Sequence, residues 1–260
     1  MASFNVMLNS GPHIILLQLL IALAAATQML GQETASPAKS FVPFVGCKSD
    51  GQVGPLDAPR GKSKRIYAPP DTARRLAYYQ VESGLGVLAP RGWFCFGAYG
   101  SSGTNLYITP QPINSKLLFT SSWKGFSGHA IQFSIEYGGT SGRFGVAQTI
   151  ARIFPTHSKF VSNVISEGEP KSDFPRGPYP NDKLVYKSAE IVEFETPPNS
   201  NGLGTDSFLR PSSDPIRGMR ILVGTDPDLL SLSIHLSAED KDLISIIIRQ
   251  AEQQAKSHKP

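Results

Sequence analysis

Short segments in which every second residue is apolar recur along the second half of the chain. The segments 131–137 and 230–236 both follow this pattern, and His235 is one of the polar members of the second. Successive side chains of a strand point to opposite faces of a sheet, so a period of two predicts half-buried β-strands. We expect His235, on the polar face of its strand, to be a solvent-facing or capped side chain. Further strands are predicted at 87–96, 106–108, 183–188, 190–196 and 217–224.

Apolar residues spaced three or four positions apart predict helices in four other segments. Asp71, Ser141 and Ser237 stand where the N-cap of a helix is expected, and Gly84 and Pro155 stand where a helix ends. The last segment has the clearest apolar stripe behind a capping pattern. Helices are therefore predicted at 71–83, 141–154, 160–165 and 237–251.

The order of these elements indicates the fold class. Strands with alternating faces are typical of antiparallel sheets, and helices are predicted before, between and after them. We expect an α+β protein with a largely antiparallel sheet packed with helices, and an α-β-α sandwich is one arrangement of this class. The chain has no internal repeat, and residues 47–255 are expected to form a single α+β domain.

The first 31 residues contain no Asp, Glu, Lys or Arg. Their apolar run of 13 residues from Ile14 to Ala26 has one polar member. Such a run is shorter than the roughly 20 residues that span a bilayer, and it suits the apolar core of a signal peptide. Residues 1–31 are therefore predicted to be a signal peptide cleaved near 26–31, and 32–46 a flexible linker. Because no basic residue precedes the run, an uncleaved anchor or a buried helix stays the alternative.

Cys47 and Cys95 are the two cysteines of the chain. Two cysteines of an exported protein commonly pair, and a bridge here would close a loop of about 50 residues and contribute roughly 3–4 kcal/mol in the chain-entropy model. Two buried free thiols are one alternative. Lipidation of Cys47 is another, because Phe44-Val45-Gly46-Cys47 resembles a lipoprotein box.

The composition narrows the class of protein further. Glycine (24) and proline (21) are frequent, apolar residues make up 40% and charged residues 18%. These values fit a globular protein with many turns and exclude collagen, a coiled coil and a multi-span membrane protein. The net charge is +4, and the stretch from Arg60 to Arg75 carries six cations and one acid. Such a stretch can meet an anionic envelope surface, whereas nucleic acid is not an expected partner of an exported protein.

Three glycine- and serine-rich loops, at 100–103, 125–129 and 138–143, are the candidate functional segments. None matches the G-x-S-x-G pattern of a nucleophile elbow, and turn formation is their simplest role. The third precedes a predicted helix, where free backbone amides can bind an anion. The predicted ligand-binding residues lie in or beside these loops: Trp93, Tyr99, Ser101, Ser102 and Arg143.

A serine hydrolase is the alternative function. Ser127 or Ser141 would be the nucleophile and His235 the base, with Asp182 completing the order serine, acid, histidine. Cys95 would be a thiol nucleophile only in the absence of a disulfide. The histidines show no H-x-x-x-H spacing and the cysteines no C-x-x-C spacing, so no metal site and no cofactor is predicted.

Two groups of motifs resemble a family of exported bacterial proteins of uncharacterised function. They are G-W-x-C-F-G-x-Y-G-S-S-G at 92–103 and G-G-T-S-G-R-F at 138–144, and the resemblance extends over residues 41–250. It implies export and a disulfide between Cys47 and Cys95, and it implies no activity. The segment 90–93, the central helices and the final strand and helix at 228–254 also resemble the PsbP-type α-β-α sandwich, a similarity of fold that does not settle function.

We therefore expect a periplasmic or extracellular protein that is not an enzyme and that binds a small ligand or a component of the cell envelope. Nucleic acid is not expected as a partner, and contact with a membrane is expected only through an uncleaved leader.

Overall fold

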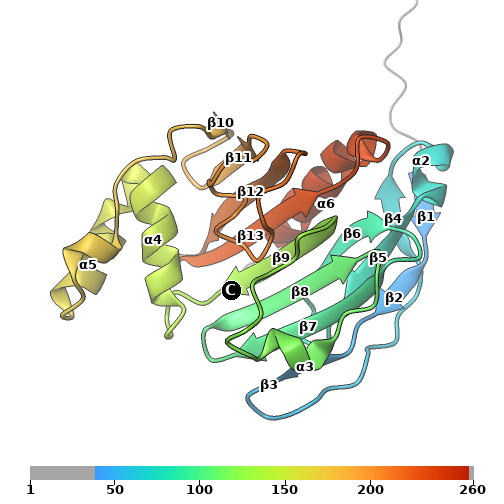
Figure 1. The fold of residues 1–260 in the computed structure, drawn as a ribbon, viewed down its shortest axis with the longest axis horizontal. Helices are drawn as coiled ribbons and strands as arrows, with labels where there is room; N and C mark the ends of the chain where they lie inside the picture. Colours follow the sequence, from blue (N-terminus) through green and yellow to red (C-terminus); the bar gives the residue numbers. More distant parts are fainter. Residues whose placement is uncertain (1–38, 258–260) are drawn as a thin grey trace, which may run out of the picture. The chain divides into compact units, whose positions relative to one another are not determined.

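An eight-stranded sheet is the centre of residues 39–257, the part of the chain that this computed structural model describes (Figure 1). The strand order is β10-β11-β12-β13-β9-β8-β7-β3, and every neighbouring pair is antiparallel except β3 and β7. The predicted α+β class with a largely antiparallel sheet is confirmed. In chain order, the strands are β3 (Ser49–Gly51), β7 (Phe94–Gly100), β8 (Gly103–Thr109), β9 (Ala130–Glu136), β10 (Lys183–Tyr186), β11 (Ile191–Thr196), β12 (Ile216–Val223) and β13 (Asp228–His235).

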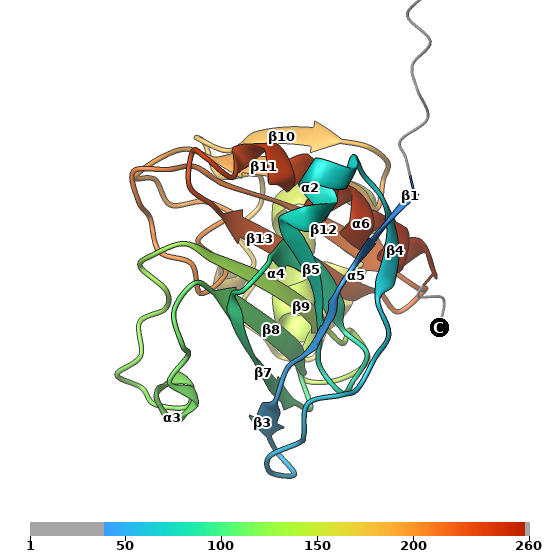
Figure 2. The same ribbon diagram turned by 90° about the vertical axis from the view of Figure 1, so that its right-hand side faces the viewer.

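Two smaller sheets are formed by the N-terminal part of the described chain. The three-stranded sheet has the order β2-β5-β6, and the two-stranded sheet pairs β1 with β4, beside the short helix α2 (Figure 2). Their bounds are β1 (Lys39–Val42), β2 (Phe44–Gly46), β4 (Lys64–Tyr67), α2 (Pro70–Arg74), β5 (Leu76–Gln80) and β6 (Gly86–Pro90).

Helices cover both faces of the large sheet. Helix α6 packs against β12, β13 and β6, and helix α4 packs against β9 and β13, with α5 beside it (Figure 1). No described helix is long and apolar enough to cross a membrane. The helices are α3 (Ser115–Leu118), α4 (Arg143–Ile153), α5 (Ser158–Ser166) and α6 (Ile244–Ser257), with short 3₁₀ turns at Pro155–His157, Lys171–Asp173 and Lys241–Leu243.

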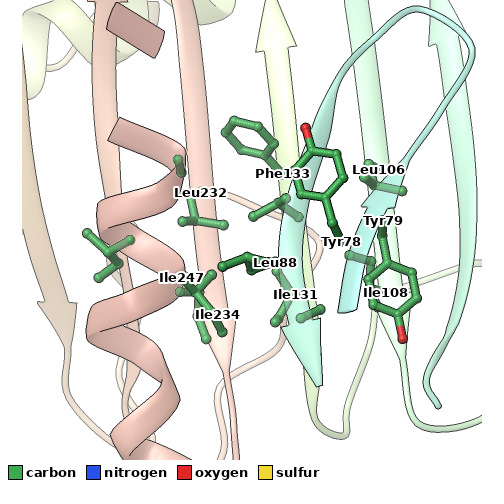
Figure 3. Close-up of a cluster of buried hydrophobic side chains, with 14 of the residues drawn as sticks. Tyr78, Tyr79, Leu88, Leu106, Ile108, Ile131, Phe133, Leu232, Ile234 and Ile247 are labelled. Carbon is green, nitrogen blue, oxygen red and sulfur yellow. The ribbon is translucent and has the colours of Figure 1, made fainter. Parts of the chain in front are cut away.

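The face of the large sheet toward α6 is apolar. Phe133, Leu232, Ile234 and Ile247 lie there in one buried cluster with side chains of β5 and β6 (Figure 3). Burying apolar surface stabilises a fold by about 25 cal/mol per Å², so this cluster is the main core.

The opposite face, toward α4, carries polar side chains that are nevertheless buried. Gln132, Arg220, Ser233 and His235 are each at most 5% exposed. These positions alternate with core residues, as the period of two predicts. Of the two alternatives expected for His235, the solvent-facing one is wrong, because the side chain is buried and both ring nitrogens have hydrogen-bond partners. Helix α4 covers part of the face, and the turn that contains Leu203 is hydrogen-bonded to Arg220.

The predicted helix 71–83 is the main error in secondary structure. Its first residues form α2, and then Leu76–Gln80 runs as strand β5 between β2 and β6. Four of the five residues of β5 are buried. A strand covered on both faces has a continuous apolar run instead of an alternating one, and such a run also satisfies helical spacing.

The predicted flexible linker 32–46 is wrong for its described part. Lys39–Val42 and Phe44–Gly46 are strands. The first is held against the domain, because Val42 is wholly buried and the Ser40 hydroxyl donates to the carbonyl of Ala68, 2.8 Å away. The predicted signal peptide and its cleavage region lie outside the described residues.

Candidate functional site

The first and third glycine-serine loops lie against each other. The hydroxyls of Ser101 and Ser141 are 3.2 Å apart, and the amide of Tyr137 donates to the carbonyl of Ser102. A side chain at Gly142 would clash with this carbonyl, since a Cβ there would lie 2.2 Å from it. Glycine is therefore required for the close approach of the two loops.

The predicted ligand-binding residues do not all converge on one cavity. Tyr99 lines a cavity of about 300 Å³ with Glu82 and Tyr137, and its hydroxyl donates to the carbonyl of Gly54. Arg143 is ion-paired with Glu167 at 2.6 Å. Trp93 precedes β7, whereas Tyr99 lies near the end of that strand, about 20 Å away along an extended chain.

His235 is held by two hydrogen bonds at the end of β13. Its Nδ1 lies 3.0 Å from the carbonyl oxygen of Gly128, and its Nε2 lies 2.7 Å from Oγ of Ser212. A carbonyl can only accept, so Nδ1 carries the proton and Nε2 accepts from the Ser212 hydroxyl. Burial lowers the pKa of His235, which keeps the imidazole neutral and able to accept a proton.

The two serines predicted as partners of His235 are not hydrogen-bonded to it. Ser141 follows the far end of β9, whereas His235 pairs with Ala130 at the start of that strand, so the two lie about 20 Å apart. Ser127 is exposed and precedes Gly128. Ser212 was missed because a serine in a polar loop has no local pattern that connects it to a distant histidine.

A cluster of potential metal ligands surrounds the same histidine. Nε2 of His129 is 4.0 Å from Oδ2 of Asp214, and the rings of His129 and His235 are 5.1 Å apart, edge to face. One ligand atom from each of these three residues lies within 4.8 Å of the others. The prediction of no metal site considered only spacing within the sequence, and it overlooked this cluster.

Cys47 and Cys95 form a disulfide, as predicted. Cys95 therefore has no thiol that could act as a nucleophile. The disulfide also fits an oxidising compartment.

The buried polar face under α4 contains the Glu136–Arg220 cavity, which consists of two adjoining cavities. The inner one has about 50 Å³ and the outer one about 290 Å³. Glu136, Thr149 and Asp206 line both. The inner cavity is lined mainly by serines, Gln132 and Arg220, and the outer one by Arg152, Asp173 and Tyr179. Hydrogen-bonding groups therefore converge from six separate segments.

Arg220 is fixed at the bottom of this cavity. Its guanidinium donates to the carbonyls of Leu203 and Leu232, at 2.6 and 3.1 Å, and contacts Oγ of Ser233 at 3.4 Å. Burial lowers the pKa of Arg220 to about 10, which leaves it charged at neutral pH. The other guanidinium of the cavity, that of Arg152, lies 3.8 Å from the ring centre of Tyr179.

Glu136 differs from these residues because its carboxylate has no hydrogen bond or ion pair within residues 39–257. It lies against Gly145 in the first turn of α4, where a Cβ would be only 1.9 Å from Oε2. Burial raises the pKa of Glu136, and the charge of Arg220 acts in the opposite direction. An acceptor of this kind at a cavity wall is available to a ligand.

Sequence reasoning missed most of this cavity. Asp206, Tyr179 and Arg152 come from loops and a helix whose proximity only the fold creates. The one available signal was Arg220, a single arginine inside the apolar run from Met219 to Val223.

Comparison of the chain with models of protein families, with curated proteins and with solved structures found no match. The chemistry of the two polar clusters is therefore the ground for inferring a function.

Proposed function

We propose that the protein is an exported, non-enzymatic binding protein that holds a small ligand with an ammonium group in the Glu136–Arg220 cavity. The observation that carries this proposal is the unpaired carboxylate of Glu136 between two adjoining polar cavities. Polar groups that are removed from water are normally hydrogen-bonded, so the unpaired carboxylate of the half-buried Glu136 is a position where a donor from outside is favoured.

The charges of the lining residues favour a cationic ligand. Three carboxylates, those of Glu136, Asp173 and Asp206, face two guanidiniums. Both guanidiniums already have partners, since Arg220 binds backbone carbonyls and Arg152 stacks on Tyr179. An ammonium group would therefore supply the missing positive partner of Glu136.

Export is part of the proposal. The disulfide between Cys47 and Cys95 and the charge-free apolar leader support an oxidising compartment outside the cytoplasm. The resemblance to an exported bacterial family points the same way and stays a prediction.

A thermal-shift screen tests the ligand class. The probes are small amines, free amino acids and amino sugars, with glucose as the neutral comparator of an amino sugar. We expect at least one ammonium compound to raise the melting temperature, with glucose inactive. Glu136→Gln keeps the shape but loses the charge, and it should weaken binding about tenfold or more, because a hydrogen bond to a charged group contributes about 1.5–3 kcal/mol.

Glu82→Gln is the matched control, because Glu82 lines the separate cavity beside Tyr99. It should leave the affinity unchanged. If Glu82→Gln weakens binding and Glu136→Gln does not, the ligand occupies the cavity at Tyr99 and our assignment is wrong. The same holds if neutral sugars bind as tightly as amino sugars.

A serine hydrolase is the second candidate function, favoured by the contact between Ser212 and His235. The imidazole is oriented by the Gly128 carbonyl and accepts from the hydroxyl at 2.7 Å, which is the arrangement of a nucleophile and its base. The nucleophile would be Ser212 instead of Ser127 or Ser141.

A fluorophosphonate probe tests this second candidate. Covalent labelling of the intact protein should be lost in Ser212→Ala and kept in Ser213→Ala, its neighbour in the chain. An unlabelled wild-type protein would leave Ser212 with a structural role, because it also accepts a hydrogen bond from the amide of Asp214.

A further inference from the structure

Three potential metal ligands converge at one edge of the large sheet. His129 directly precedes β9, Asp214 lies two residues before β12, and His235 ends β13. The strands β12, β13 and β9 are adjacent and antiparallel, so the start of β9, the end of β13 and the start of β12 lie at the same edge. Residues that are far apart in the chain therefore meet on a rigid scaffold.

From this geometry we infer that His129, Asp214 and His235 form a binding site for one zinc ion. Two imidazole nitrogens and one carboxylate oxygen are a ligand set that suits zinc, which takes three protein ligands and leaves a fourth position open in many sites. The ligand atoms lie within 4.8 Å of one another, and about 3.3 Å is expected around a tetrahedral zinc ion, so the side chains need to draw closer together. His129 and Asp214 can do so, because their side chains are 38% and 37% exposed.

The hydrogen bonds of His235 support this inference. Metal-binding histidines commonly donate their second N–H to a backbone carbonyl, which fixes the ring, and Nδ1 of His235 donates to the carbonyl of Gly128 in this way. Its Nε2 then carries the lone pair that would bind the metal. In the structure this atom is hydrogen-bonded to Ser212.

Ser212 can release Nε2 without losing its own hydrogen bond. Its hydroxyl lies 2.7 Å from Nε2 of His235 and 3.1 Å from the carbonyl oxygen of its near neighbour Asp214. Rotation of the hydroxyl would move its proton from the first acceptor to the second. The imidazole nitrogen is thereby available to zinc while no buried donor is left unpaired.

The cluster adjoins a largely apolar cavity at His129. This cavity has about 370 Å³, and its wall includes His129, Gly128, Phe126 and Trp123. None of the three zinc ligands lines the Glu136–Arg220 cavity, and Glu136 itself lies at the other end of β9. The nearest lining residue of that cavity, Ser233, is two residues from His235 along β13.

Zinc binding to the untagged full-length chain tests the inference. Isothermal titration with zinc chloride alone, checked by metal analysis after dialysis, should give one zinc ion per chain with a Kd of about 1 µM or tighter. His129→Ala and Asp214→Asn should each weaken binding by about 100-fold or more, because removal of even an indirect partner of a metal ligand weakens affinity 10–100-fold. The melting temperature of the wild type should rise with zinc and that of these variants should not.

His157→Ala is the matched control. Nε2 of His157 also lies near a carboxylate, 3.9 Å from Oε1 of Glu190, but no third ligand joins the pair in the described residues. This variant should bind zinc as the wild type does. Equal affinity in His129→Ala and the wild type, or no binding by the wild type at micromolar zinc, would overturn the inference.

Two further variants separate this inference from the functions proposed above. Ser212→Ala should abolish labelling by a fluorophosphonate but keep zinc binding, because the hydroxyl is not one of the three ligands. Glu136→Gln should lose the ammonium ligand but keep zinc. Loss of zinc binding in Ser212→Ala with a folded protein would mean that the three-ligand assignment is wrong.

Discussion

The two faces of the large sheet are both covered, but they bury different chemistry. The face toward α6 consists of apolar side chains such as Leu232 and Ile247. The face toward α4 buries Gln132, Arg220 and His235, and it is the side on which both candidate sites are built. Burying a polar group without a partner costs free energy, so the second face needs hydrogen bonds to loops that the first does not need.

This difference separates the parts of the molecule that stabilise the fold from those that carry chemistry. The apolar face and the disulfide beside it are expected to account for most of the stability. The polar face is expected to contribute less and to provide the sites. Each of the following variants compares the two.

The largest effect is expected from the disulfide, which belongs to the apolar side. Cys47 is buried in the main core, and the bridge to Cys95 closes a sequence separation of 48 residues. Cys47→Ala with Cys95→Ala should lower the free energy of unfolding by about 4 kcal/mol in the chain-entropy model. Urea denaturation measures this change, and dithiothreitol should destabilise the wild type but not the double variant. A loss below about 1 kcal/mol would show that the bridge adds little to this side of the sheet.

The next effect compares neighbours on opposite faces of β13. Leu232 is wholly buried on the apolar face, so Leu232→Ala should cost about 3 kcal/mol through lost burial and the cavity left behind. Ser233 is 1% exposed on the polar face and has one weak partner, Arg220, so Ser233→Ala should cost about 1 kcal/mol. Urea denaturation of both variants measures the two losses in the free energy of unfolding, and we expect the loss in Leu232→Ala to be the larger. Equal losses would contradict the distinction between the two faces.

The smallest effect on stability is expected at Glu136. The ionised carboxylate that would bind the proposed ligand lowers the stability of the folded protein. Burial raises the pKa of Glu136 in the folded state, so the folded protein binds this proton more tightly than the unfolded one. The stability that this tighter proton binding contributes to the folded protein is therefore fully present below the ordinary pKa of 4.5. It is lost as the pH rises through the raised pKa of Glu136. Glu136→Gln should be more stable than the wild type at pH 7.5, and the difference should vanish on acidification below 4.5.

Thermal unfolding of both proteins between pH 4 and pH 8 measures this dependence, a range set by the ordinary pKa of about 4.5 and neutral conditions. Glu82→Gln serves as the reference for a glutamate outside the cavity, because Glu82 lines the separate cavity beside Tyr99. If Glu136→Gln is less stable than the wild type across the range, the carboxylate has a stabilising partner and is not an open acceptor.

Local patterns in the sequence were sufficient for most elements of the large sheet and for its class. The alternation at 131–137 and 230–236 matches β9 and β13, and the spacing at 141–154 matches α4, because these periods follow from the geometry of a single strand or helix. The pairing of the two cysteines was also predicted. Strand β5 was not, since a strand buried on both sides has no alternation to detect.

The candidate sites depended on contacts that no local pattern contains. The sequence by itself determined that Glu136 and His235 lie on polar sides of strands, because side-chain direction alternates along a strand whatever surrounds it. Only the tertiary structure decided that α4 and the loops cover those sides and that Arg220 and Glu136 line the same cavity. It also decided that Ser212, His129 and Asp214 lie beside His235. Antiparallel pairing brings the ends of distant segments to one edge of a sheet, and such proximity is a property of the whole chain.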